Sequence, residues 1–166
     1  MMRLGTVQNA QSLNYFRCYS ICLTTHFSLV FGDKVIMKML ELFAGTGSVG
    51  KVAQEMGFEI TSLERDMEAT IKTDIMDWNL RELPPNSFDL IWALPPCTEH
   101  SRAKTTGVRK ITEANEIVKR TIEIIEYFQP RYWVIENLQT GLLKNQHFMM
   151  LLPFKDIDYC KYGMKY

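Results

Sequence analysis

The sequence contains little cysteine and no excess of charge of either sign, and each shortage excludes a class of protein. Four cysteines among 166 residues are too few for a disulfide scaffold, and nothing accompanies Cys18 and Cys22 to complete a zinc site. Basic and acidic residues both number 19, so the whole molecule carries no strong signature of non-specific nucleic-acid binding. A local basic strip is compatible with this balance. We therefore expect a protein of a reducing, intracellular compartment, without a bound metal.

Long apolar runs are also missing. The longest early stretch without formal charge, residues 18–32, is too short and too rich in Ser, Thr and His to span a membrane. It lacks a suitable signal-peptide cleavage site. A hydrophobic fraction of 46% and a charged fraction of 23% are ordinary for a globular domain. We expect a cytoplasmic protein, or a nuclear one in a eukaryotic or viral host.

The pattern of the chain predicts one α/β domain over residues 37–166. Residues 1–36 have no sustained periodicity and are predicted to be a poorly ordered extension, and a true start after this extension is an open alternative. Strands and helices then alternate, which favours a mostly parallel, Rossmann-like sheet with helices on both faces. The expected strands cover residues 35–43, 58–63, 70–75, 88–93, 132–135 and 157–160, and the expected helices cover residues 48–56, 112–128 and 144–152.

A glycine-rich turn follows the first strand of this domain. Residues 45–50 read G-x-G-x-x-G at the start of a helix, where unpaired N–H groups and absent side chains admit a nucleotide. Glu64 ends the next strand, 19 residues after Gly45, and its carboxylate could accept both ribose hydroxyls. Asp74 is either a partner for an adenine amino group or an ordinary exposed acid. The turn alone fits S-adenosylmethionine and a nicotinamide dinucleotide equally well, and a plain strand–helix turn is the alternative.

A cysteine and a glutamate stand at the ends of two later strands. Pro95 and Pro96 fix the backbone before Cys97, which suits a positioned nucleophile, although a lone cysteine is usually an inert core residue. Glu136 ends the strand over residues 132–135. Because the carboxyl ends of parallel strands form one crevice, we expect the thiol and the carboxyl to meet there.

The loop after Cys97 is basic. No acid lies between Ser101 and Lys110, and nearby cations favour the reactive thiolate. The same cations could meet phosphates, or they could form a solvated loop without function. The residues of this loop that we expect on the substrate side are Ser101, Arg102 and Lys104.

Three motifs together resemble the cytosine-C5 DNA methyltransferase family, particularly its short, single-domain phage and virus members. They are Leu42-Phe43-Ala44-Gly45-Thr46-Gly47, then Pro95-Pro96-Cys97 with Ser101, then Glu136-Asn137, in the family's order. The resemblance covers about residues 37–166. It implies S-adenosylmethionine as cofactor and DNA as substrate, with RNA as a close variant, in a role such as restriction–modification.

The resemblance also implies a role for each matching residue. Cys97 would attack C6 of a flipped-out cytosine, and Glu136 would protonate or hydrogen-bond N3. Asn137, on the substrate side, would hold the Glu136 loop and the Cys97 backbone in place. The cofactor would contact Phe43, Ala44, Gly45, Thr46, Gly47, Glu64, Asp74 and Pro95.

Several positions depart from the family pattern. Leu94 replaces a small residue, Thr98 a frequent glutamine, His100 a frequent aromatic residue, and Leu138 a valine or proline. The family's base-holding basic motif, target-recognition region and final cofactor-closing motif have no evident counterpart, so we expect a domain truncated at its C-terminal end. Two alternatives to an active methyltransferase stay open: a non-catalytic module that binds S-adenosylmethionine, and an NAD-dependent oxidoreductase.

Overall fold

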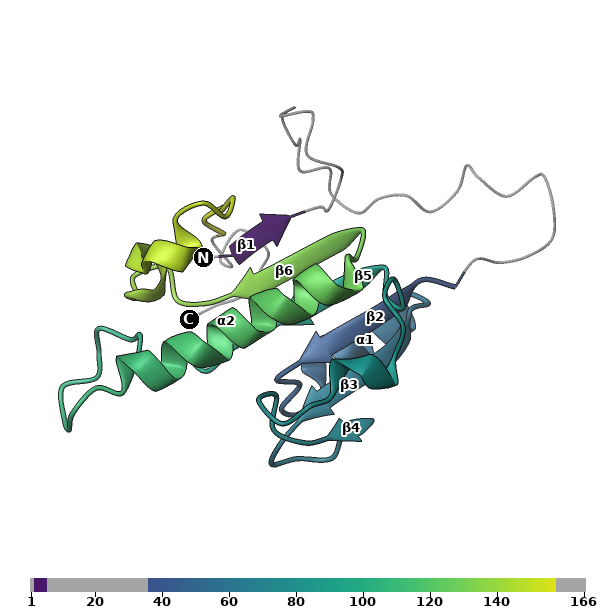
Figure 1. The fold of residues 1–166 in the computed structure, drawn as a ribbon, viewed down its shortest axis with the longest axis horizontal. Coiled ribbons are helices and arrows are strands. Elements are labelled where there is room, and N and C mark those ends of the chain that lie inside the picture. The colour runs from purple at the N-terminus through teal and green to yellow at the C-terminus, as the bar shows by residue number, and fades with distance from the viewer. Residues whose placement is uncertain (1, 6–35, 158–166) are drawn as a thin grey trace.

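A computed structural model describes residues 2–5 and 36–157, which form one six-stranded sheet with two main helices (Figure 1). The strands lie in the order β1-β6-β5-β2-β3-β4, and every neighbouring pair is parallel except β1 and β6. The predicted α/β, Rossmann-like fold is therefore confirmed. In chain order the elements are β1 (Met2–Gly5), β2 (Lys38–Leu42), α1 (Ser48–Glu55), β3 (Glu59–Glu64), β4 (Ile71–Lys72), η1 (Leu80–Glu82), β5 (Leu90–Ala93), α2 (Ile111–Phe128), β6 (Tyr132–Glu136), η2 (Leu143–Asn145) and η3 (His147–Met149).

The chain reverses direction across the sheet at β2. From β2 it proceeds outward through β3 and β4, and then returns to the other side of β2 to form β5 and β6. Helices that leave neighbouring strands on opposite sides of such a reversal open a crevice at the strands' carboxyl ends. The topology alone thus places a ligand cleft beyond the ends of β2 and β5.

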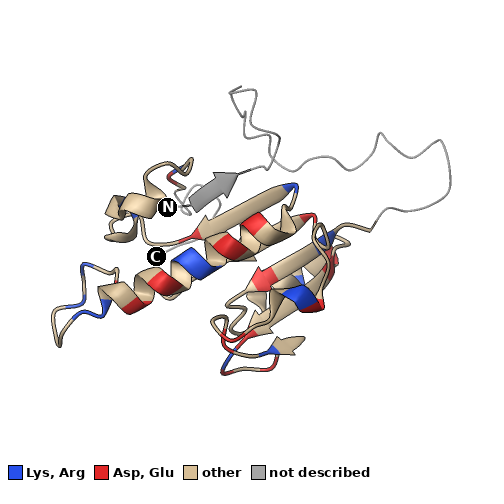
Figure 2. Cartoon of the chain, in the orientation of Figure 1, with Lys and Arg blue, Asp and Glu red and all other residues tan. Residues whose placement is uncertain are grey.

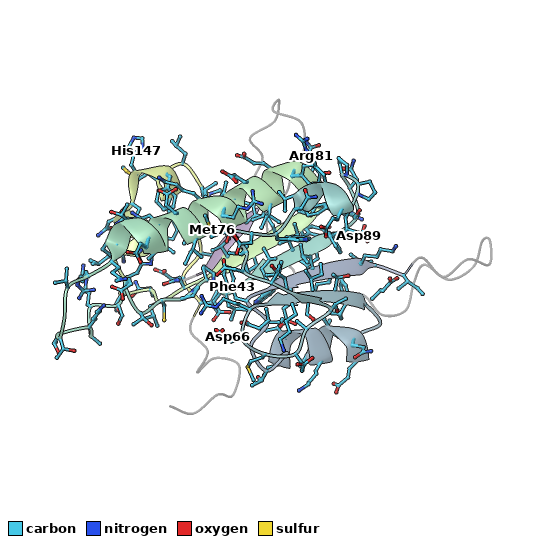
Figure 3. All side chains as sticks on the ribbon, turned by 60° about the horizontal axis from the view of Figure 1, so that its bottom comes forward. Phe43, Asp66, Met76, Arg81, Asp89 and His147 are labelled. Atoms are coloured by element: carbon cyan, nitrogen blue, oxygen red, sulfur yellow. The ribbon has the colours of Figure 1, made fainter. Side chains whose placement is uncertain are left out.

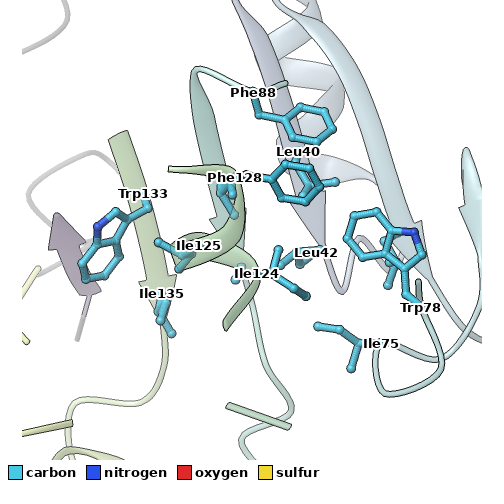
Figure 4. Close-up of a cluster of buried hydrophobic side chains, with 13 residues drawn as sticks. Leu40, Leu42, Ile75, Trp78, Phe88, Ile124, Ile125, Phe128, Trp133 and Ile135 are labelled. Carbon is cyan, nitrogen blue, oxygen red and sulfur yellow. The ribbon is translucent and has the colours of Figure 1, made fainter. Parts of the chain in front are cut away.

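The side chains of β2 alternate between two packed faces. Leu40 and Leu42 point into the main core, which α2 covers with Phe128 and its apolar neighbours (Figure 4). Phe128 lies 5.8 Å from the stacked ring of Trp78, measured between centroids. Glu41 points to the other face, where it meets Gly50 of α1. Figure 3 shows the two helices on opposite sides of the strands.

Several predicted element boundaries were wrong, for local reasons. The strand expected over residues 70–75 ends at Lys72, because the Asp74 carboxylate and carbonyl accept three backbone N–H groups that follow and so close a turn. The helix expected over residues 112–128, with Thr112 as its cap, begins one residue earlier, at Ile111, and the N–H of the residue before it, Lys110, donates to Glu99. The helix expected over residues 144–152 is two short 3₁₀ turns, η2 and η3.

The first residues of the chain also differ from expectation. Met2–Gly5 forms strand β1, with Met2 opposite Glu136 and Gly5 opposite Trp133. Four residues on a sheet edge are too few to give a readable alternation, which is why the sequence pattern missed them. Residues 6–35 lie outside the described part of the chain, as do residues 158–160 of the last expected strand. The domain boundary at residue 37 stays a prediction.

Candidate active site

The glycine-rich turn has a backbone shape that only glycine adopts freely. Gly45 and Gly47 have φ angles of 53° and 68°, and a Cβ at either position would meet nothing within 4 Å. The left-handed backbone, and not crowding, therefore demands glycine there. Phe43 has a φ of 60° without that freedom, and such strain in a bulky residue is typical of functional sites.

The Glu64 carboxylate connects this turn to the end of β3. One oxygen accepts the Gly45 N–H at 2.8 Å, and the other accepts the N–H groups of Arg65 and Asp66 at 2.9 and 3.2 Å. The predicted acid therefore lies against the predicted turn. Its hydrogen bonds hold Gly45 in the left-handed conformation, and a carboxylate with about four lone-pair sites can accept further donors.

A cavity of about 140 Å³ lies beside the turn at the reversal of the sheet. It brings together three of the predicted cofactor residues, Phe43, Glu64 and Asp74. Pro96 lines it instead of the predicted Pro95, which is buried and accepts a hydrogen bond from Asn137. The lining residues that the motifs did not indicate are Leu63, Arg65, Asp66, Thr73, Ile75, Pro96 and Ile117.

Asp74 is already engaged at the edge of this cavity. One carboxylate oxygen accepts the N–H of Met76 at 2.9 Å, and the other lies 3.4 Å from the Arg65 guanidinium. Arg65 bonds Asp66 more closely, at 2.9 Å, and this bond lowers the pKa of the Asp66 carboxyl. Arg65 therefore joins two acids at the cavity mouth and competes with any ligand for Asp74.

Cys97 and Glu136 follow neighbouring strands at the same edge of the sheet. Strands β5 and β6 are parallel, with Ala93 opposite Ile135, so both chains leave the sheet at one level. Cys97 is a free, half-buried thiol, and Glu136 is half-buried at the end of β6. Asn137 is buried and donates from its side chain to the Pro95 carbonyl at 3.2 Å. This bond joins the two segments.

The basic loop is largely folded onto itself. Lys104 lies 2.5 Å from Glu99, with both side chains about one-fifth exposed. Arg109 donates to the carbonyls of Glu99, Ser101 and Lys104 at 2.7–2.9 Å. Arg102 is exposed. Of the predicted substrate-side cations, Arg102 is thus accessible and Lys104 is paired.

Glu99 is the residue that the sequence pattern overlooked. It lies just before the acid-free stretch, yet its carboxylate holds both Lys104 and the backbone N–H of Lys110. The hydrogen bond from Lys104, followed by that from Lys110, lowers the pKa of the Glu99 carboxyl. Lys104 is therefore paired within the loop, along which Lys and Arg residues outnumber the acids (Figure 2).

Within residues 2–5 and 36–157, no helix is long and apolar enough to cross a membrane. In the same part of the chain, no group of three or more acidic, histidine or cysteine side chains is arranged to hold a metal ion.

Comparison with known proteins supports the motif-based interpretation. A sequence model of the family described as C-5 cytosine-specific DNA methylase matches residues 37–164. The chain belongs to this family. The resemblance predicted from the three motifs is therefore confirmed.

Relatives of this methylase family member include viral and bacterial proteins. It is 30% identical over 141 residues to a probable DNA (cytosine-5)-methyltransferase of Frog virus 3 (isolate Goorha), covering 76% of this chain and 64% of that protein. It is 29% identical to the type II methyltransferase M.NgoPII of Neisseria gonorrhoeae, covering 67% of this chain and 36% of that protein. It is 28% identical to the type II methyltransferase M.AgeI of Thalassovita gelatinovora, covering 64% of this chain and 29% of that protein. The chain thus spans from under a third to just under two thirds of these relatives.

Proposed function

We propose that this methylase transfers a methyl group from S-adenosylmethionine to C5 of cytosine in DNA, through a covalent bond between Cys97 and the base. The observation that carries the proposal is the convergence of two parallel strand ends. Cys97 follows β5 and Glu136 is the last residue of β6, and the Asn137–Pro95 hydrogen bond holds these ends together beside the glycine turn. Family membership favours S-adenosylmethionine over a nicotinamide dinucleotide in that turn.

The residues around the cavity fit a nucleoside cofactor. Glu64 offers a carboxylate for ribose hydroxyls, Asp74 one for an exocyclic amino group, and Phe43 and Pro96 offer apolar surface. The turn formed by Ala44, Gly45, Thr46 and Gly47 adjoins this cavity at the start of α1. When bound, S-adenosylmethionine supplies an electrophilic methyl group.

The chemistry of the base falls to Cys97 and Glu136. The Cys97 thiolate bonds to C6 of a cytosine that has left the duplex stack, while the Glu136 carboxyl protonates N3 and so neutralises the negative charge that the attack places on the ring. C5, made electron-rich by this attack, would take the methyl group, and the sulfur of the methyl donor would keep the electrons of the broken bond. Loss of the C5 proton to water would then expel the Cys97 sulfur and restore the aromatic base, and N3 would return its proton to Glu136.

Contacts to the DNA backbone fall to the loop after Cys97. Arg102 is exposed there and is available to a phosphate, and Ser101 immediately follows the turn after the thiol. Lys104 would first have to leave Glu99, and this exchange would couple DNA binding to a rearrangement of the loop.

Trapping on fluorocytosine tests the proposal. A mixed-sequence duplex carrying 5-fluorocytosine is incubated with the chain and S-adenosylmethionine, because fluorine at C5 cannot leave as a proton and the covalent adduct accumulates. We expect a denaturant-resistant protein–DNA band with the wild type and none with Cys97→Ser. An RNA oligonucleotide of the same sequence distinguishes the two substrate classes.

A second measurement separates the alternatives. Calorimetric binding of S-adenosylmethionine without any adduct would identify a non-catalytic binding module. A preference for NAD over S-adenosylmethionine, or an adduct that persists in Cys97→Ser, would overturn the proposed mechanism.

A further inference from the structure

A closed circuit of hydrogen bonds joins the Cys97 turn to α2 and to the segment after Glu136. The His100 ring nitrogen Nε2 lies 2.9 Å from Asn115 Oδ1, and Asn115 Nδ2 donates to Gln146 Oε1 at 2.9 Å. Gln146 Nε2 donates to the Leu142 carbonyl at 3.3 Å, and the Leu142 N–H returns to the His100 carbonyl at 2.8 Å. We call these four residues the His100 circuit.

The direction of each side-chain hydrogen bond in this circuit follows from the carbonyl group of Leu142. The Leu142 carbonyl can only accept, so Gln146 must present its amide nitrogen there and its oxygen to Asn115. Asn115 must then donate to Gln146 and accept from the ring. His100 therefore carries a hydrogen on Nε2 and donates it to Asn115 Oδ1.

His100 is an unusual residue for this position. Its side chain is fully buried, and Nδ1 is buried without a hydrogen-bond partner in the described part of the chain. A phenylalanine ring here would fill the space without a polar atom to satisfy. Burying the unpaired Nδ1 destabilises the folded protein, and we infer that the hydrogen bond of Nε2 to Asn115 offsets this cost.

The circuit is also the attachment of the basic loop to the rest of the protein. The other hydrogen bonds described for residues 98–109 stay within residues 97–110, including those of Glu99, Lys104 and Arg109. Those that reach other segments belong to His100: its ring bonds α2, and its carbonyl accepts from Leu142.

The segment after Glu136 packs closely against the same residue. A Cβ at Gly141 would meet the Leu138 carbonyl oxygen at 3.1 Å and the His100 carbonyl oxygen at 3.3 Å. On the other side, the His100 N–H donates to the Cys97 carbonyl at 3.1 Å. His100 thus lies one turn from the thiol and in contact with the chain that leaves Glu136.

We propose that His100, Asn115 and Gln146 are positioning residues, which hold the Cys97 turn in register with the Glu136 segment while the thiol attacks the base. The inference rests on the proposed function. The Asn137–Pro95 bond fixes the two segments at the strand ends, and the His100 circuit fixes them again beyond Cys97. The thiol is thereby held between two anchors.

Four variants test this role. His100→Phe keeps a ring but removes the donor, and Gln146→Glu keeps the shape but cannot donate to Leu142. His100→Gln retains an N–H for Asn115 and is the conservative rescue. Glu116→Gln, at an exposed position of α2 next to Asn115, is the matched control.

The main measurement is the single-turnover rate of adduct formation on fluorocytosine DNA, with the S-adenosylmethionine dissociation constant and the Tm recorded for each variant. We expect His100→Phe and Gln146→Glu to slow the adduct on the order of tenfold to a hundredfold, with cofactor affinity unchanged, as for a slightly misplaced reacting group. His100→Gln should recover most of the rate, and Glu116→Gln should match the wild type.

Two results would overturn the inference: a folded His100→Phe protein with the wild-type adduct rate, or a loss of cofactor affinity as large as the loss of rate. If His100→Phe fails to fold, the double variant His100→Phe/Asn115→Leu removes both partners of the ring hydrogen bond, so that neither is left unpaired, and we expect it to fold and remain slow.

The failure of the proposed function is distinguishable from the failure of this inference. If the wild type forms no adduct, the circuit is measured by the rate at which iodoacetamide alkylates Cys97, with the modified peptide identified by mass. A loosened turn exposes the half-buried thiol, so the circuit variants should react faster than the wild type and Glu116→Gln. Equal rates would reject the circuit.

Discussion

At the scale of single residues, the most unusual group is a carboxyl in the middle of the sheet. Glu41 is 1% exposed on β2, and one of its oxygens has no hydrogen-bond partner in the described structure. Burial raises the pKa of Glu41, although hydrogen bonds from the backbone of Gly50 and Val49, together with the charge of Lys51, oppose the shift. The N-terminal half of α1 thus packs against the Glu41 carboxyl, and folding favours the protonated form of this group.

Glu41→Gln should reveal this carboxyl in the pH dependence of stability. The folded state binds the Glu41 proton more tightly than the unfolded state, whose pKa is near 4.5. The stability of the wild type relative to Glu41→Gln should therefore be greatest below pH 4.5 and decline as the pH rises through the higher folded pKa. Denaturant unfolding of both proteins across this range measures it, and a difference that does not vary with pH would contradict the assignment.

Gly50→Ala should destabilise the domain. A Cβ at Gly50 would collide with the Glu41 carboxylate and lie 3.2 Å from Ile60, so either the buried carboxylate would have to leave its backbone donors or the helix would have to move. Overpacking of this kind costs about 1–3 kcal/mol. Val52→Ala, at an exposed position of the same helix, should change the unfolding free energy by only about 0.5 kcal/mol. Equal effects of the two substitutions would contradict this packing.

At the scale of elements, the loop between β5 and α2 depends on Glu99 for its internal order. Because the pKa of Glu99 is lowered, the carboxylate stays charged below its usual range, and the order that it provides is present above the unfolded pKa of 4.5. That order is lost as the pH falls through the lower, folded value.

Glu99→Gln should open this loop at neutral pH. The amide keeps one acceptor but loses the charge that holds Lys104, so trypsin should cleave after the exposed Arg102 faster than in the wild type. Glu113→Gln removes an exposed acid paired with Lys110 and is the control, with no expected change. Unchanged cleavage in Glu99→Gln would show that Arg109 alone orders the loop.

Sequence patterns predicted most of the elements but few of their tertiary partners. The strand before the glycine turn and the helix to Phe128 were readable because their periodicity and terminators are local. The start of α2 at Ile111 could not be predicted, because Glu99, which accepts the N–H of Lys110 just before the helix, lies in the preceding loop. The partners of His100 on α2 and near η3 were unreadable for the same reason: hydrogen bonds between distant segments leave no local pattern.

At the scale of the whole molecule, strand β1 completes the sheet beside the site. It pairs antiparallel with β6 along four residues and so covers the backbone of the strand that carries Glu136. An uncovered edge of this kind would invite pairing with another chain.

Deletion of residues 1–36 should therefore lower the Tm and promote self-association. If residues 1–36 were only a poorly ordered extension, their deletion would change neither the Tm nor the state of association. Thermal unfolding with sedimentation velocity distinguishes the two. A shorter deletion, of residues 8–34, retains β1 and should behave as the wild type if the strand alone matters.

The register of β1 has a practical consequence for anyone who purifies this protein. Met2 lies opposite Glu136, so a polyhistidine tag fused ahead of it would emerge within a few ångströms of the carboxyl that is proposed to hold the flipped base. Kinetics recorded on such a fusion would mix catalysis with obstruction of the proposed site by the tag. Cleaving the tag before assay removes that ambiguity.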